Sequence, residues 1–239
     1  MNVVFSICLS LFLFFSEFSD AQNAEPVVSF ERSDITAGDS AHLMSAYGNN
    51  KEFIPQFTLQ TLIALSYFPE LKETHIRFIY RHANSLFTTR PVFPCLLSNG
   101  KKRTFTITIS DSSIDKLQPL LIERMDFNTQ IGIIGHELSH VSDFSKRSVT
   151  SLIGSGIGHV FSTHYIDRFE FRTDSVCIAH GLGYQLLSWS TFVRRTMHTA
   201  NWEGADNVNE PMTHERYMNP STIRQHIAAN PLYSKNAIK

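Results

Sequence analysis

A buried helix that carries two histidines and a glutamate constrains the fold of this chain more than any other feature. Residues 127–144 are largely apolar at helical spacing, and they contain His136, Glu137 and His140 in an HExxH pattern. Positions four apart lie about 40° apart around a helix, so both imidazoles face one side. Burial of these polar groups is costly unless they share a partner. The pattern therefore predicts a metal ion held by His136 and His140, with Glu137 as a general base.

A second pair of residues one helical turn apart follows downstream. Glu170 and Asp174 lie in a helical pattern that covers residues 159–195. Glu170 offers a carboxylate as third ligand, and Asp174 is placed to orient a metal-bound histidine. Three protein ligands leave one position open on a zinc ion, as in catalytic sites. His159 and His164 could replace Glu170, but we favour Glu170 because neither histidine has a carboxylate four positions further on.

The HExxH and ExxxD patterns together resemble those of the gluzincin metallopeptidases, the thermolysin-like and M48-like group. The resemblance covers about residues 104–187 and implies a small M48-like or minigluzincin-type catalytic domain. It implies that His136, His140 and Glu170 are the zinc ligands. It also implies that Glu137 is the general base and that Asp174 hydrogen-bonds a ligand histidine. The metzincin pattern requires glycine and histidine where this chain has Asp143 and Lys146.

The resemblance implies hydrolysis of a peptide bond in a peptide or protein substrate. One Zn²⁺ per chain would lower the pKa of a bound water, and Glu137 would accept the water's proton. The strand expected at 104–110 would be the cleft-side edge to which an extended substrate adds. A further group should stabilise the oxyanion. Four residues are candidates for that role: His180, His198, His214 and Tyr217.

Two alternatives to a peptidase remain open. In the first, the chain is a non-catalytic, zinc-stabilised binding module of an exported protein. Glu137 argues against this alternative, because a purely structural site has no use for a general base. In the second, the chain is a secreted interaction protein whose HExxH is coincidental. Measurement of bound metal distinguishes the second alternative, and the activity of Glu137→Gln distinguishes the first.

Composition indicates one globular domain. The 239 residues are 42% hydrophobic and 18% charged, which is sufficient for one sizeable core. A formal net charge of -1 gives no electrostatic basis for binding nucleic acid. The short basic run at residues 101–103 is expected to be a solvated hairpin tip. Composition leaves the oligomeric state open.

The N-terminus predicts export. Residues 3–15 are almost entirely apolar, and the small residues Ser19 and Ala21 precede Gln22. This pattern is typical of a secretory signal covering residues 1–21, which would direct the protein to the periplasm or the extracellular space. The apolar run is shorter than the roughly 20 residues of a membrane span, and no later segment qualifies. An uncleaved N-terminal anchor is the alternative.

The remaining patterns predict an α+β fold, a small zincin-like domain with a short mixed β-sheet, the HExxH helix and a downstream glutamate helix. Residues 22–50 are expected to form a polar, irregular arm or pro-like segment, and residues 51–239 the catalytic domain. Periodicity predicts further helices at 57–68, 117–124 and 223–229 and strands at 74–81 and 103–110.

Prolines, glycines and cysteines add local expectations. Pro91 and Pro94 restrict segment 88–97 to the edge of a sheet, if it pairs at all. Gly181 and Gly183 predict that the glutamate helix is kinked, or thinned for close packing, at these positions. An oxidising compartment would permit a disulfide between the two cysteines of the mature chain, Cys95 and Cys177, but the sequence does not establish their separation.

Overall fold

The computed structural model of the chain describes residues 24–93, 103–151, 163–200, 202 and 215–238. These residues form a mainly helical α+β structure with one small four-stranded mixed sheet, which confirms the predicted class. No helix within these ranges has both the length and the apolar character needed to cross a membrane. The predicted signal, Cys95, His159 and His214 lie outside the described residues.

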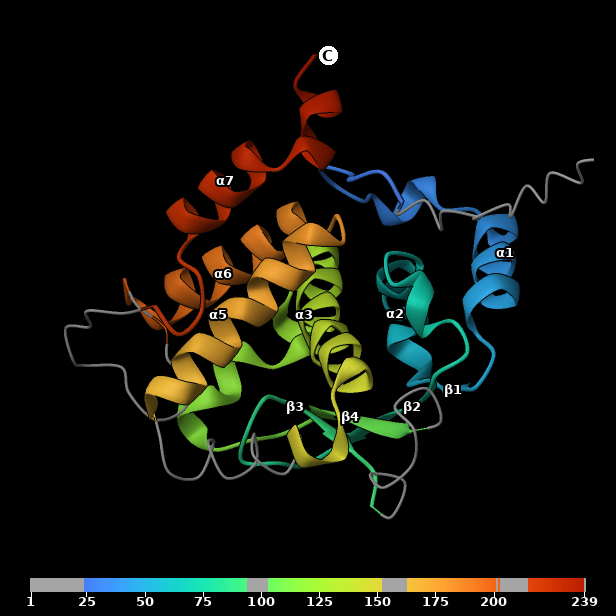
Figure 1. Ribbon diagram of the computed structural model, residues 1–239, viewed down its shortest axis with the longest axis horizontal. Helices are drawn as coiled ribbons and strands as arrows, with labels where there is room; N and C mark the ends of the chain where they lie inside the picture. Colours follow the sequence, from blue (N-terminus) through green and yellow to red (C-terminus); the bar gives the residue numbers. More distant parts are fainter. Residues whose placement is uncertain (1–23, 94–102, 152–162, 201, 203–214, 239) are drawn as a thin grey trace, which may run out of the picture.

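The helices cover both sides of a central helix above the sheet (Figure 1). The α-helices are α1 (Ala37–Tyr47), α2 (Thr58–Ser66), α3 (Phe127–Lys146), α5 (Thr163–Ala179), α6 (Gly183–Met197) and α7 (Pro220–Ala229). The 3₁₀ helices are η1 (Arg32–Asp34), η2 (Pro55–Phe57), η3 (Pro69–Leu71), η6 (Asp115–Leu120), η7 (Ile122–Arg124) and η8 (Pro231–Ile238). The central helix α3 packs against α2, α5, α6 and the sheet.

The sheet places its apolar face under α3 and its polar face outward. Its strands are β1 (Lys51–Glu52), β2 (His75–Arg81), β4 (Thr104–Ser110) and β3 (Phe87–Pro91), in that order across the sheet. β1, β2 and β4 are parallel, whereas β3 is antiparallel to β4. The three apolar residues of β4, which are Phe105, Ile107 and Ile109, are buried in the core.

The prediction that the strand at 104–110 forms the edge of the sheet is wrong. β4 lies between β2 and β3, and β3 is the outer strand. β3 ends at Pro91, which confirms that the proline-containing segment pairs at an edge, where a missing N–H costs no ladder hydrogen bond. The cleft-side edge is therefore contributed by residues 87–91.

Three further expectations are corrected by local chemistry. Residues 24–50 are not irregular throughout, because Thr36 and Asp39 form a capping box that starts α1. The helix expected at 117–124 is divided into η6 and η7, with Pro119 inside η6. Arg103 is not solvated. It is buried and donates to the carbonyls of Phe144 and Arg147 (2.9 and 2.7 Å), where it satisfies free carbonyls at the end of α3.

The glutamate helix is broken rather than kinked. α5 ends at Ala179 and α6 begins at Gly183, and between them Gly181 has φ +102°, a conformation that glycine adopts readily. The single helix expected over residues 159–195 is therefore two helices. Both pack on α3, so the break lets one continuous stretch of chain cover two sides of the central helix.

Close packing on α3 depends on glycine. A Cβ atom on Gly132 would overlap the backbone carbonyl of Gln185 in α6, and one on Gly135 would overlap the side chain of Leu182. The buried thiol of Cys177 lies near Gly135 in the same contact. Cys177 is thus a core residue, as a small apolar side chain would be.

Candidate metal centre

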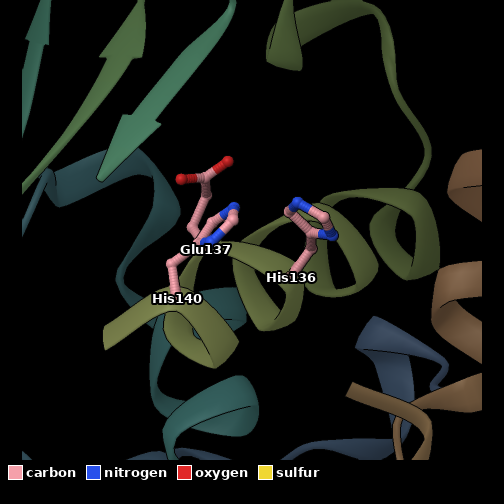
Figure 2. A group of neighbouring side chains, drawn as sticks. All are labelled: His136, Glu137 and His140. Atoms are coloured by element: carbon pink, nitrogen blue, oxygen red, sulfur yellow. The ribbon is translucent and has the colours of Figure 1, made fainter. Parts of the chain in front are cut away.

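His136, Glu137 and His140 lie on neighbouring turns of α3 and are all buried (Figure 2). One donor atom from each residue lies within 4.8 Å of the other two. α3 begins after Asp126, whose side chain accepts a hydrogen bond from the N–H of Thr129 and so caps the first turn. A buried group of two imidazoles and a carboxylate at this spacing could hold a metal ion.

A second carboxylate approaches the same two imidazoles from α5. The Oε2 atom of Glu170 lies 3.2 Å from Nε2 of His136 and 3.3 Å from Nε2 of His140. The Oδ1 atom of Asp174 lies 2.8 Å from Nδ1 of His136. The structure therefore brings Glu170 and Asp174, predicted from their spacing alone, into contact with the HExxH histidines.

Hydrogen bonds on the far side of each ring determine which nitrogen faces Glu170. Asp174 binds Nδ1 of His136 and also accepts from the backbone N–H of Met218 at 2.8 Å. Nδ1 of His140 lies 3.2 Å from the hydroxyl of Thr173. That hydroxyl donates its hydrogen to the carbonyl of the residue four positions earlier (2.9 Å), so it accepts from His140. In both rings Nδ1 is therefore the donor, and Nε2 faces Glu170.

The convergence of these groups favours a positive charge at the centre. The two Nε2 atoms and a carboxylate oxygen face one another in a buried space, and without a proton or a metal ion between them all three would be acceptors without a donor. Burial alone would lower the pKa of His136, but the hydrogen bonds that its ring donates to the carboxylates of Asp174 and Glu170 outweigh burial and hold that pKa well above its ordinary value. Burial would raise the pKa of Glu170, but the His140 charge and the hydrogen bonds to both rings lower it. The arrangement can therefore hold a proton or a metal ion between these groups.

Glu137 is held differently from Glu170. Its Oε2 atom accepts a hydrogen bond of 2.6 Å from the hydroxyl of Thr89, which belongs to the edge strand β3. Figure 2 shows its carboxylate on the strand side of α3. Sequence analysis did not identify Thr89, because no periodicity or motif links residue 89 to the HExxH helix.

A cleft of about 1020 Å³ opens over His136 and Glu137. β3 forms one wall, and Ile133 of α3, Trp189 of α6 and Trp202 give the cleft an apolar lining. None of the described residues 24–50 is among those that line the cleft. The described part of the N-terminal segment thus leaves the cleft open.

Tyr217 is the oxyanion candidate that the structure brings to the cleft. Its ring centroid lies 5.8 Å from that of His136. Burial, together with the nearby charges of Glu170 and Glu137, raises its pKa well above the ordinary value, so the phenol keeps its proton. His180 instead binds Glu70 away from the site.

Of the other histidine candidates, those that the structure describes do not line the cleft. His198 ends α6 in a left-handed conformation with φ 51°. His164, the alternative third ligand, lines a separate surface hollow beside Asp167. Glu170, rather than His164, is therefore the third-ligand candidate that faces both HExxH histidines.

Two arginines, which sequence analysis did not identify, anchor the segment that contains Tyr217. Arg194 of α6 is buried and donates to the carbonyl of Tyr217 at 3.1 Å and to Oδ1 of Asn219 at 2.9 Å. Arg216 pairs with Asp167 of α5 at 2.7 Å. These contacts attach residues 215–219 to both α5 and α6.

Comparisons of the chain with protein-family models, with curated proteins and with solved structures give no match. Relatives therefore offer no guide to its activity, and the geometry of the centre is the basis for a functional proposal.

Proposed function

We propose that the chain is a zinc-dependent peptidase of the gluzincin type, built on a small zincin-like domain. The observation that carries the proposal is the position of Glu170 Oε2, 3.2 and 3.3 Å from the Nε2 atoms of His136 and His140. Ligand atoms bound tetrahedrally to zinc at 2.0–2.1 Å lie about 3.3–3.4 Å from each other. The two contacts therefore have the length of tetrahedron edges around one ion.

The donor set also favours zinc. Two imidazoles and one carboxylate form a three-ligand site with an open fourth position. Asp174 and Thr173 orient the two rings, as supporting hydrogen bonds do in zinc sites. When bound there, zinc would supply Lewis acidity toward a peptide carbonyl and would lower the pKa of a water molecule.

Glu137 is the proposed general base. Its carboxylate lines the cleft, so it can accept a proton from water and pass that proton to the leaving amine. Thr89 holds one carboxylate oxygen, which limits the orientations of the base. Tyr217 retains its phenolic proton and can donate it in a hydrogen bond to the oxyanion that develops on the substrate carbonyl.

The substrate is proposed to bind as an extended strand beside β3. The N–H of Val92 donates to Thr104, and that of Ser110 donates to Leu86, so the even-numbered residues of this segment pair inward with β4. The peptide groups of Phe87 and Thr89 therefore point outward along the cleft. A peptide strand added there would pass over Glu137.

The decisive experiment combines metal analysis with one substitution. The full chain should bind one zinc ion and cleave members of a diverse peptide library. Glu137→Gln should keep the zinc and lose about 10²–10⁴-fold in turnover, the usual contribution of a general base. Loss of zinc in Glu137→Gln would show that Glu137 is a ligand. A zinc-loaded chain that binds peptides and cleaves none would establish the non-catalytic binding module instead.

A further inference from the structure

Arg90 lies at the open end of a charged row that crosses the whole sheet. In the strand register Glu52 of β1 is opposite Arg77 of β2, Arg77 is opposite Thr106 of β4, and Thr106 is opposite Arg90 of β3. Residues directly opposite one another project on the same face of a sheet. Thr106 alternates with the buried Phe105, so this row lies on the solvent face.

Only one end of the row has an arginine paired with a carboxylate. Glu52 and Arg77 form an ion pair of 3.1 Å. Thr106 is uncharged, and Arg90 is exposed. Within the part of the chain that the structure describes, no carboxylate forms an ion pair with Arg90. The edge of the row that a bound peptide would extend therefore carries a positive charge without a partner.

Most of the charged residues that line the cleft are positive, like Arg90. Among the described residues that line it, the cations are Arg81, Arg90 and Arg216, and the acid is Glu137. Asp167 neutralises Arg216 at 2.7 Å, whereas Arg81 and Arg90 are exposed. An incoming peptide thus meets a positive potential along β3, which favours negatively charged substrates.

We infer that the cleft selects peptides with an acidic side chain at the position opposite Arg90. This inference rests on the proposed function, because it places an extended peptide beside β3. The peptide residue paired with Thr89 would lie over Glu137, and its neighbour would be opposite Arg90. That neighbour projects to the solvent face, where directly opposite Cβ atoms lie about 4.5–5.5 Å apart. An Asp or Glu there would form an ion pair with Arg90, as Glu52 does with Arg77 at the other end of the row.

A binding experiment tests the inference without requiring turnover. Fluorescently labelled peptides of roughly ten residues on an uncharged background, with Asp, Asn or Lys placed at each position in turn, would be titrated against zinc-loaded Glu137→Gln. At one position Asp should bind about two- to fivefold more tightly than Asn, the range for an exposed cross-strand ion pair. Salt at about 1 M should remove most of that preference.

Matched variants assign the preference to Arg90. Arg90→Gln, introduced into the same background, should abolish the preference for Asp, and Arg90→Glu should change it to a preference for Lys. Arg77→Gln removes an exposed arginine from the same row, two strands from the edge, and should leave the preference intact. Circular dichroism of each variant checks that the fold is retained.

The outcomes separate this inference from the proposed function. Equal binding of Asp and Asn peptides at every position, absence of peptide binding, or the same preference in all variants overturns the role of Arg90. Cleavage by the wild-type chain without charge preference also overturns it, and leaves the peptidase proposal in place. Asp-selective binding by a wild-type chain that cleaves no peptide supports the inference and overturns the peptidase.

Discussion

The hydroxyl of Thr89 lies 2.6 Å from Oε2 of Glu137, so the edge strand and the HExxH helix meet at the proposed general base. A hydrogen bond to a charged group contributes about 1.5–3 kcal/mol. Thr89→Val removes the hydroxyl with little change in shape. We expect kcat to fall about tenfold or more with zinc content unchanged.

Two neighbouring substitutions control that experiment. Thr89→Ser keeps the hydroxyl and should retain most of the turnover. Thr88→Val removes a hydroxyl from the other face of β3 and should have little effect on kcat. Equal rates for Thr89→Val and wild type would show that the contact does not position Glu137.

Glu170 and Asp174 should differ in their effect on metal binding. Glu170→Ala removes a proposed ligand and should empty the site, as should His136→Ala. Asp174→Asn alters only the group that orients His136, so zinc affinity should fall about 10–100-fold while the fold persists. Competition against a metal chelator measures each affinity, and the exposed Asp115→Asn serves as control. Full zinc occupancy in Glu170→Ala would rule out the ligand assignment.

Gly132 should be intolerant of any side chain. A methyl group there would overlap the backbone carbonyl of Gln185, which cannot move without displacing α6. Gly132→Ala should lower the free energy of unfolding by about 1–3 kcal/mol. Gly38→Ala, in α1, places its methyl group in ordinary contact and should change stability by less than about 1 kcal/mol. Urea titration of both variants makes the comparison, and equal midpoints would contradict close packing at Gly132.

Glu70 should make stability depend on acid pH. Burial tends to raise its pKa, but hydrogen bonds from His180 and Ser142 lower it from 4.5 to about 2. An acid whose pKa is lower in the folded state stabilises the fold above its unfolded pKa. That contribution should be lost as the pH falls from about 4.5 to about 2.

Glu70→Gln isolates that contribution. The variant should be less stable than wild type at neutral pH, and the difference should shrink below pH 4.5 as the wild-type carboxylate becomes protonated. Thermal unfolding at several pH values measures it. A stability difference that does not change with pH would show that the ionised form of Glu70 is not the stabilising one.

The N-terminal pattern makes a prediction about the mature protein. Removal of a signal covering residues 1–21 should give an N-terminus at or near Gln22 in exported material. N-terminal sequencing of protein from the native host tests this. Recovery of chains that begin at Met1 in the cytosol would contradict export.

Local patterns predicted the parts of this fold that depend on short-range chemistry. Residues four apart on one helix share a face whatever surrounds them, so the pairing of His136 with His140 and of Glu170 with Asp174 could be inferred from spacing. The alternation of Phe105, Ile107 and Ile109 likewise marked the buried face of β4.

Those patterns did not predict contacts between residues that lie far apart in the sequence. β4 has the clearest strand pattern. The periodicity of a strand does not indicate whether a further strand pairs beyond it, and in this fold β3 pairs with the outer side of β4. Thr89 and Arg194 act through contacts with residues 48 and 23 positions away, with Glu137 and Tyr217 respectively. The positive φ of Gly181 breaks the helix where the sequence predicted a kink, and composition alone does not determine the φ of a residue.

The hydrogen bond from Met218 to Asp174 has a consequence for the order in which the protein is made. His136, His140, Glu170 and Asp174 are all synthesised before Met218, 44 residues beyond Asp174. A nascent chain that has emerged only as far as α6 carries every proposed ligand but lacks the N–H that holds Asp174 against His136. Until Met218 has emerged from the ribosome, the centre cannot reach its final arrangement, and the growing chain lacks the contact that completes it.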